Sequence, residues 1–232
     1  MTLALFDLDH TLLSADSDYH WGQFLVSRGL VDTEQYAQAN HQFYQQYKAG
    51  TLDIHEYFAF SMRAVSEQDM ATARAWHRDY MQAFVLPYLG QPARDLVEKH
   101  RALGHTLVII TATNSFVTAP IAAEFGVENL LAIEPVIENG RYTNRIAGVP
   151  SFREGKVTRL QQWLQGRNET LEGSWFYSDS HNDLPLLELV DHPVAVDPDE
   201  QLLARAQQQG WPVISLNAWL AEAPRTPAAP AP

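Results

Sequence analysis

Hydrophobic residues recur along this chain with two different periods, and the change from one period to the other divides the chain. The first apolar run, TLALF at residues 2–6, is short and continuous, as expected of a buried strand. From residue 15 to residue 86, aromatic and aliphatic residues recur at helical spacing, and no strand pattern interrupts them. We therefore predict one strand followed by a long helical segment.

After residue 86 the pattern alternates between helices and strands, beginning where Pro87 and the Gly90–Gln91–Pro92 stretch interrupt the helical period. The spacing predicts helices near 92–103, 115–125, 154–165, 182–190 and 199–209. It predicts strands at 105–111, 174–179, 193–196 and 212–216, with a hairpin over 132–148 that turns at Asn139–Gly140. This alternation is typical of a parallel sheet with helices on both faces.

The predicted fold is therefore α/β, with residues 1–14 and 87–222 forming the core domain. Residues 15–86 are expected to form an inserted, all-helical cap after the first strand. Ligands of such sheets bind outside the carboxyl ends of the strands, so the cap would lie over that edge as a lid. The last residues, 223–232, are rich in Pro and Ala and are expected to be disordered.

Composition limits the classes of ligand. The 232 residues are 46% hydrophobic, enough for a full core, and 16 Lys and Arg against 28 Asp and Glu give a net charge of −12. This charge disfavours binding to nucleic acid or to an anionic membrane and leaves small molecules as ligands. The chain has no cysteine, no signal-peptide pattern at its start and no apolar stretch long enough to cross a membrane, so we expect a cytoplasmic protein.

Two carboxylates follow the first strand. Asp7 and Asp9 are two residues apart, so their side chains would lie on the same side of the chain and repel each other. Such a pair suggests a metal site, an acid/base pair, or both. A purely structural alternative is a solvated turn in which Asp9 caps a helix that starts near Thr11.

Other predicted strands place polar residues at the same edge of the sheet. Thr111, followed by Thr113 and Asn114, ends one strand, and Asp179 ends another. Asn182 and Asp183 come one helical turn after Asp179, and Lys156 lies at the start of a predicted helix. The structural alternatives are helix caps for the two aspartates, a plain strand end for Thr111 and an exposed position for Lys156.

These residues, in this order, resemble the motifs of the haloacid dehalogenase superfamily of phosphatases. FDLDHT is similar to its first motif, the apolar run with Thr111 to its second, Lys156 to its third, and SDSHND to its acidic fourth. The helical segment between the first and second motifs is placed like a type-one cap. Within the superfamily the phosphoserine-phosphatase-like branch is most similar, which implies a Rossmann-like core and phosphatase activity on a small phosphorylated metabolite.

The resemblance also implies roles. Asp7 would be the nucleophile that forms an aspartyl-phosphate, and Asp9 the acid/base that protonates the leaving alcohol and then activates water. Thr111 and Lys156 would bind the phosphoryl oxygens, and we place Asn114 and Asn182 in the same binding group. Mg²⁺ would be held by Asp7, the main-chain carbonyl of Asp9, and Asp179; Asp183 would join the metal site or orient Lys156.

Substrate choice should depend on the cap. By the resemblance, Asp16 falls where an acidic residue binds a substrate amine, with Asp18 beside it, and Arg63 is the candidate partner for a substrate carboxylate. We expect an amine-bearing phosphomonoester, histidinol phosphate or phosphoserine, and hence a role in amino acid biosynthesis. The alternatives are a phosphotransferase that passes the phosphoryl group from Asp7 to an alcohol and a non-catalytic phospholigand-binding module. Structurally, Asp16 and Asp18 could simply cap the helix that follows.

The remaining candidates have simpler interpretations. His10 and His181 flank the predicted catalytic carboxylates, but no two histidines have the HxxxH spacing of a zinc site, so we interpret them as lining or surface residues. The aromatic residues of the helical segment are expected to pack its core, although one or two could face the ligand. They are Trp21, Phe24, Phe43, Tyr47 and Tyr57.

Overall fold

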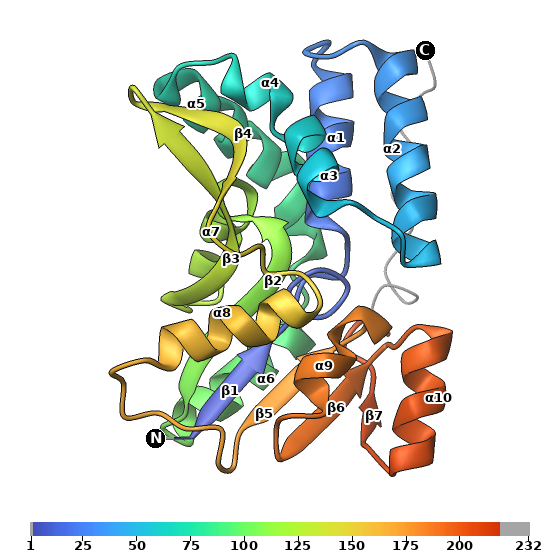
Figure 1. The fold of residues 1–232 in the computed structure, drawn as a ribbon, viewed down its shortest axis with the longest axis vertical. Helices are drawn as coiled ribbons and strands as arrows, with labels where there is room; N and C mark the ends of the chain where they lie inside the picture. Colours follow the sequence, from blue (N-terminus) through green and yellow to red (C-terminus); the bar gives the residue numbers. More distant parts are fainter. Residues whose placement is uncertain (1, 219–232) are drawn as a thin grey trace.

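The computed structural model describes residues 2–218, so the predicted tail at residues 223–232 lies outside the described residues. The centre of the molecule is a seven-stranded sheet with the strand order β4-β3-β2-β1-β5-β6-β7 (Figure 1). Neighbouring strands are parallel except for the antiparallel pair β3 and β4. The predicted fold class, an α/β protein with a largely parallel sheet, is confirmed.

The elements follow one another as the sequence pattern indicates. The strands are β1 (Leu3–Phe6), β2 (Thr106–Asn114), β3 (Asn129–Glu138), β4 (Arg141–Ala147), β5 (Trp175–Ser178), β6 (His192–Val196) and β7 (Val213–Ile214). The helices before β2 are α1 (Ser17–Ser27), α2 (Thr33–Ala49), α3 (Ile54–Ser61), α4 (Arg63–Ser66), α5 (Met70–Tyr80), the π-helical turn η1 (Met81–Val85), the 3₁₀ turn η2 (Leu86–Tyr88) and α6 (Gln91–Ala102). The later ones are α7 (Ser115–Glu124), α8 (Glu154–Leu164), the 3₁₀ turn η3 (His181–Asp183), α9 (Leu184–Leu187) and α10 (Glu200–Gln209).

The central strand β1 is fully buried, and its side chains alternate between the two faces of the sheet. Leu3 and Leu5 pack in a cluster with residues of α8, α9 and α10, whereas Ala4 and Phe6 pack in a second cluster with residues of α6 and α7. An apolar residue at every position is therefore required, because both faces of β1 are covered by helices. This burial fixes the carboxyl end of β1, where Asp7 follows.

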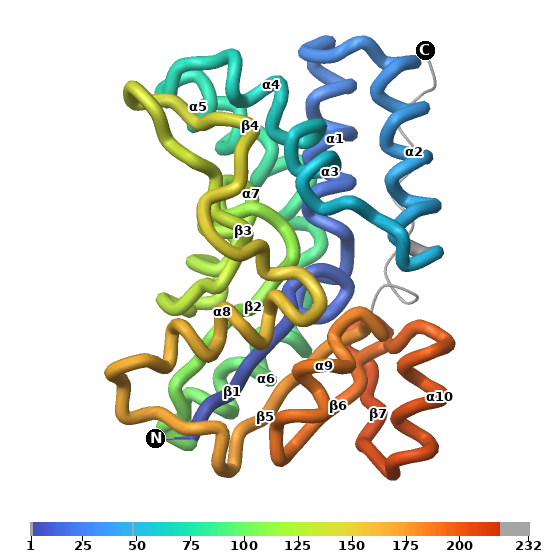
Figure 2. Tube along the Cα trace, in the orientation of Figure 1, coloured from blue at the N-terminus to red at the C-terminus, as the bar shows by residue number. Residues whose placement is uncertain are grey.

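The helical segment at residues 15–86 is built around aromatic residues, as predicted, and it lies beyond one end of the sheet (Figure 2). The ring of Trp21 lies 5.2 Å from the ring of Phe24 and 5.3 Å from that of Phe116 on α7. Because this cluster is continuous with the side of the sheet that carries Phe6, α1 is attached to the core. The division into a core and a cap remains a prediction about folding units.

Three predicted elements differ from the structure. The predicted strand 105–111 continues to Asn114, because a register shift between Ile110 and Asn114 lets β2 go on pairing with β3. The hairpin turns at Asn139–Gly140 as predicted, both with positive φ, but β3 begins earlier and pairs with β2 before it pairs with β4. The predicted helix 182–190 is instead η3 followed by the short α9, since Asp183 N donates to Ser180 O in a 3₁₀ turn.

Beneath the sheet, His100 of α6 is buried and joined to two polar partners. Its Nε2 lies 2.8 Å from the hydroxyl of Tyr177, and its Nδ1 lies 2.8 Å from Nδ1 of His105. Burial, with smaller contributions from His105 and Lys99, lowers the pKa of His100 to about 4. The imidazole is therefore neutral in the folded protein at neutral pH.

This neutral histidine should make stability depend on pH. An unfolded histidine has a pKa of about 6.5, so between pH 6.5 and 4 the unfolded chain binds more protons at this site, and stability is lost as the pH falls. We predict that His100 lowers the free energy of unfolding by about 2 kcal/mol between pH 7.5 and pH 5. Urea denaturation of the wild type and His100→Gln at both pH values measures this; His41→Gln, on the exposed side of α2, is the control. Parallel pH profiles for the wild type and His100→Gln would contradict it.

Candidate functional site

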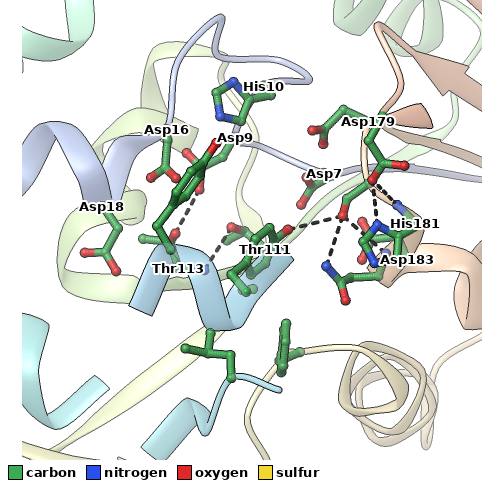
Figure 3. Close-up of a pocket in the computed structure, with 18 of the residues that line it drawn as sticks. Asp7, Asp9, His10, Asp16, Asp18, Thr111, Thr113, Asp179, His181 and Asp183 are labelled. Carbon is green, nitrogen blue, oxygen red and sulfur yellow. Dashed lines mark hydrogen bonds and ion pairs between the residues drawn. The ribbon is translucent and has the colours of Figure 1, made fainter. Parts of the chain in front are cut away.

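A cavity of about 640 Å³ lies at the carboxyl ends of β1, β2 and β5, where parallel sheets bind ligands. The core contributes residues that follow β1 and β5 and residues near the end of β2, together with Lys156 of α8 and the start of α10. The helical segment contributes the start of α1 and residues of α2 and α3. The predicted cover of the sheet edge by the helical segment is thus present, and Figure 3 shows the carboxylates that meet there.

Asp7 and Asp183 share one cation. Nζ of Lys156 lies 2.8 Å from Oδ1 of Asp7 and 2.7 Å from Oδ2 of Asp183, and all three side chains are buried. Burial raises the pKa of Asp7 to about 7; the charge of Lys156 opposes this and that of Asp183 adds to it. Burial alone would lower the pKa of Lys156, but the two carboxylates raise it above its ordinary value. Lys156 is therefore charged, and the exposed position considered for it is wrong.

Lys156 is placed by the first turn of α8. Its N–H donates to the carbonyl of Arg153, and that of Gly155 donates to the carbonyl of Phe152. A Cβ added to Gly155 would lie 2.0 Å from the carbonyl oxygen of Pro150. Glycine is thus required at this position for the loop to approach the helix closely enough to direct Lys156 at Asp7.

Asp9 is held by the two elements on either side of it. Its Oδ1 accepts a hydrogen bond from the main-chain N–H of Ser17 (2.8 Å), and its Oδ2 accepts one from Oγ1 of Thr113 (2.8 Å). Burial, followed by the charge of Asp16, raises its pKa. The helix expected near Thr11 does not form; α1 begins at Ser17, and Asp16 is its N-cap. Asp9 is therefore a fixed, protonatable group at the edge of the cavity, rather than a solvated turn residue.

Asp179 follows β5 on the opposite side of Asp7 from Asp9 (Figure 3). Its Oδ1 accepts a hydrogen bond from Oγ1 of Thr11 (3.3 Å), and its carbonyl accepts one from the N–H of Asp199 (2.8 Å). Burial, and then the charges of Asp7 and Asp183, raise the pKa of Asp179 well above its ordinary value. Hydrogen bonds therefore hold Asp179 in place, but the charge of Lys156 does not offset the burial and the two neighbouring carboxylates.

The carboxylates suit a divalent cation. Asp7, Asp9, Asp179 and Asp183 gather around a single ammonium group, and the pKa values of the first three are raised. Within residues 2–218, no three His, Asp or Glu side chains form a complete metal-binding group by themselves. Mg²⁺ does not require one, because it keeps several waters and uses one or two carboxylates with substrate phosphate. Asp179 accepts a hydrogen bond from Thr11 and has no ammonium partner among the described residues, whereas Oδ2 of Asp183 accepts from both Lys156 and Ser178.

The other predicted phosphate-binding residues separate into two groups. Thr111 is buried at the cavity wall and Asn182 also lines it, with its amide bonded to Arg153 and Ser180. The structure does not bring Asn114 or Arg63 into the cavity. Oδ1 of Asn114 caps α7 by accepting from Val117 N, and Arg63 is an exposed residue at the start of α4.

The end of the cavity formed by the helical segment is acidic and aromatic. Asp16 and Asp18 line it from the start of α1, and burial, followed by the charge of Asp16, raises the pKa of Asp18 to about 7. Of the five aromatic residues expected to pack the core, three line the cavity, where one or two were expected to face the ligand: Phe43, Tyr47 and Tyr57. Tyr19 and Tyr44 of the helical segment and Phe152 of the core line it as well. Trp21 and Phe24 are buried in the core, as predicted.

Several residues that support the site were not assigned a role from the sequence. Thr113 anchors Asp9, and Ser178 donates to Asp183 at 2.7 Å. The hydroxyl of Tyr47 on α2 lies 3.1 Å from Oγ of Ser180. This contact connects the helical segment to the acidic loop, which is formed by residues 179–183 after β5. Serine and threonine next to a motif carry no distinctive signal, although Thr113 follows Thr111 with the spacing of a strand. Tyr47 was expected in the core of the helical segment, because helical periodicity does not distinguish a side chain that lines a cavity from one that packs in a core.

The requirement for glycine before Lys156 can be tested through stability. Gly155→Ala should lower the free energy of unfolding by about 1–3 kcal/mol, because the new methyl group overlaps the carbonyl of Pro150 and α8 must shift. The control is Glu154→Ala, an exposed change in the same helical turn, with an expected cost below about 1 kcal/mol. Chemical denaturation of both variants measures the difference; equal stability would show that the loop yields without strain.

The chain is similar to known proteins over most of its length. The haloacid dehalogenase-like hydrolase family matches residues 4–188. A protein of Neisseria meningitidis serogroup C named histidinol-phosphatase is 41% identical over 219 residues, which cover 93% of this chain and 99% of that protein. A crystal structure of a protein of unknown function from Bordetella pertussis Tohama I is 45% identical, covers 93% of this chain and 100% of that one, and superimposes with a TM-score of 0.87.

More distant structures share the fold. A substrate-bound phosphoserine phosphatase superimposes with a TM-score of 0.68 at 13% identity, covering 95% of each chain, and at that identity the likeness concerns the fold alone.

None of the helices in residues 2–218 combines the length and the apolar character that a membrane crossing needs. The match over most of the chain and the similarity to a named phosphatase lead to one conclusion: the chain belongs to the haloacid dehalogenase-like hydrolase family and is an enzyme of the phosphatase type.

Proposed function

We propose that this enzyme hydrolyses histidinol phosphate, with Mg²⁺ as cofactor and an aspartyl-phosphate on Asp7 as intermediate. The observation that carries the proposal is the difference between the two ends of the cavity. One end presents Lys156 and Thr111 beside four carboxylates, and the other presents the buried carboxylate of Asp18 among aromatic rings. Such a cavity suits a phosphoryl group joined to a cationic, ring-bearing alcohol.

The phosphoryl end has the groups that the two-step reaction needs. A carboxylate oxygen of Asp7 attacks phosphorus, and the bond from phosphorus to the substrate oxygen breaks as that oxygen takes a proton from Asp9. Asp9 then accepts a proton from water, whose oxygen attacks phosphorus and releases Asp7 and inorganic phosphate. Ser17 and Thr113 hold Asp9 in one orientation for both transfers. Lys156 balances the charge on the phosphoryl oxygens.

A bound Mg²⁺, held by Asp7 and Asp179 with the main-chain carbonyl of Asp9, would neutralise the phosphate that enters this acidic site. Asp183 has a supporting role in this arrangement, because its Oδ2 accepts from both Lys156 and Ser178. It orients the lysine that faces Asp7. Of the two roles expected for Asp183, a place in the metal site or the orientation of Lys156, we therefore propose the second.

The other end of the cavity favours histidinol phosphate over phosphoserine. Both substrates carry an amine, but phosphoserine also carries a carboxylate that needs a cationic partner. Among the cavity-lining residues that the structure describes, Lys156 is the one lysine or arginine, and it is already paired with Asp7 and Asp183. Arg63, the residue expected for that carboxylate, lies outside the cavity. The name of the 41% identical relative supports the same choice.

Substrate choice can be measured directly. We expect kcat/KM for histidinol phosphate to exceed that for phosphoserine by at least about 100-fold, because a substrate carboxylate would lie unpaired beside aspartates. Phosphate and alcohol release are followed for histidinol phosphate, phosphoserine and phenyl phosphate, with Mg²⁺ and with EDTA. Equal release of phosphate and histidinol indicates hydrolysis, whereas alcohol release in excess of phosphate would indicate transfer to an acceptor. A preference for phosphoserine, or full activity in EDTA, would contradict the proposal.

The nucleophile has its own test. Asp7→Asn should reduce kcat by at least about 10⁴-fold, since the amide is a poor nucleophile, and should abolish the binding of beryllium fluoride, which mimics a phosphorylated carboxylate. Asp32→Asn, which changes an exposed N-cap of α2, is the matched control and should retain both properties. Phosphate release is measured by steady-state assay and beryllium fluoride binding by ¹⁹F NMR. Retention of either property in Asp7→Asn would remove Asp7 from the mechanism.

A further inference from the structure

Asp16 and Asp18 are two residues apart at the start of α1, but the structure uses them differently. Asp16 is partly exposed, and its Oδ1 accepts a hydrogen bond from the N–H of Tyr19 at 2.8 Å as the N-cap of α1. This is an ordinary local role for an aspartate, and asparagine would perform it almost as well. The position of Asp16 at the cavity therefore has a sufficient structural explanation.

Asp18 has no such explanation. It lines the cavity, yet its side chain is buried with 6% of its surface exposed, and its Oδ1 has no hydrogen-bond partner among the described residues. Its one side-chain partner is the hydroxyl of Tyr57 on α3. The charged groups around it are the carboxylates of Asp16 and Asp9, both of the same sign. A buried carboxylate in these surroundings is costly unless it takes up a proton or a cation reaches it.

We infer that Asp18 binds the cationic nitrogen of the substrate and so selects phosphomonoesters that carry an ammonium or imidazolium group. The inference rests on the proposed function, and it assigns to Asp18 the role that the sequence suggested for Asp16. Figure 3 shows Asp9 and Asp7 between Asp18 on one side and Asp179 on the other, so that the two ends of one ligand would contact different residues.

The rings around Asp18 suit the same kind of group. Tyr57 lines the cavity beside Asp18, and the ring of Phe43, which also lines it, lies 5.3 Å from that of Tyr57 in an edge-to-face arrangement. Aromatic faces attract cations and stack on a flat ring, so they would add to the attraction of Asp18 for an imidazolium or an alkylammonium group. A neutral leaving group would gain nothing from the carboxylate.

The test compares two neighbouring carboxylates. Asp18→Asn keeps the size of the side chain but removes its charge, so the ratio of kcat/KM for histidinol phosphate to that for phenyl phosphate should fall about 10- to 100-fold. Asp16→Asn should change this ratio by less than about threefold, and so should Glu200→Gln, an exposed cavity residue of α10 that controls for the general negative charge. Asp18→Glu, which keeps the charge, should recover part of the preference.

Binding of histidinol separates this inference from the proposed function. Histidinol carries both nitrogen groups and no phosphate, so calorimetry at pH 8 measures its affinity independently of hydrolysis. We expect binding to wild type and Asp16→Asn and about 10-fold or greater weakening in Asp18→Asn, whatever the hydrolysis assay gives. If histidinol phosphate is hydrolysed with a preference that Asp18→Asn does not change, the proposed function stands and Asp18 has no role in selection. If wild type does not bind histidinol, the inference is overturned as well.

Discussion

The ammonium group of Lys156 lies between two carboxylates that are distant in sequence, Asp7 at 149 residues and Asp183 at 27. Both pairs are buried, so each carboxylate would be costly without this cation. The interaction requires the end of β1, the turn η3 and α8 to meet at one point, and Gly155 permits the approach. The acidic site can therefore exist only in a fold that also brings Lys156 to it.

The surroundings of this triad divide the work between the two parts of the molecule. Strand ends and the first turn of α8 hold the groups that we propose for phosphoryl chemistry, and they do so beside a sheet that is buried on both faces. The helical segment contributes Asp18, Tyr57 and Tyr47, which depend on α1, α2 and α3 for their positions. Tyr47 also connects this segment to the acidic loop through Ser180. The start of α1 belongs to both parts, because the N–H of Ser17 also holds Asp9.

The sequence was informative where a residue type has few alternative uses. Continuous apolar runs indicated the buried strands. The positions of four polar residues after or near these strands indicated a shared edge of the sheet, and the structure brings all four to one cavity: Asp7, Thr111, Lys156 and Asp179. It was less informative where local and long-range uses compete. Asn114 follows a strand in the same way as a ligand-binding residue would, but its side chain caps α7. Arg63 has the charge needed for a substrate carboxylate, but helical periodicity could not say that α4 turns it outward.

The contrast between Asp16 and Asp18 shows most clearly what the sequence could not predict. The family resemblance placed the amine-binding carboxylate at Asp16, with Asp18 beside it, because the sequence does not show which of the two side chains is buried. In the fold, Asp16 is the N-cap of α1, whereas Asp18 is buried at the wall of the cavity. The two identical side chains therefore differ in their hydrogen bonding and in their electrostatic surroundings. A carboxylate that caps a helix end is stable by itself, whereas one enclosed by rings and like charges is costly unless it is protonated or meets a cation. Incomplete hydrogen bonding, more than position in a motif, is therefore the reason why we propose Asp18 rather than Asp16 as the binding residue.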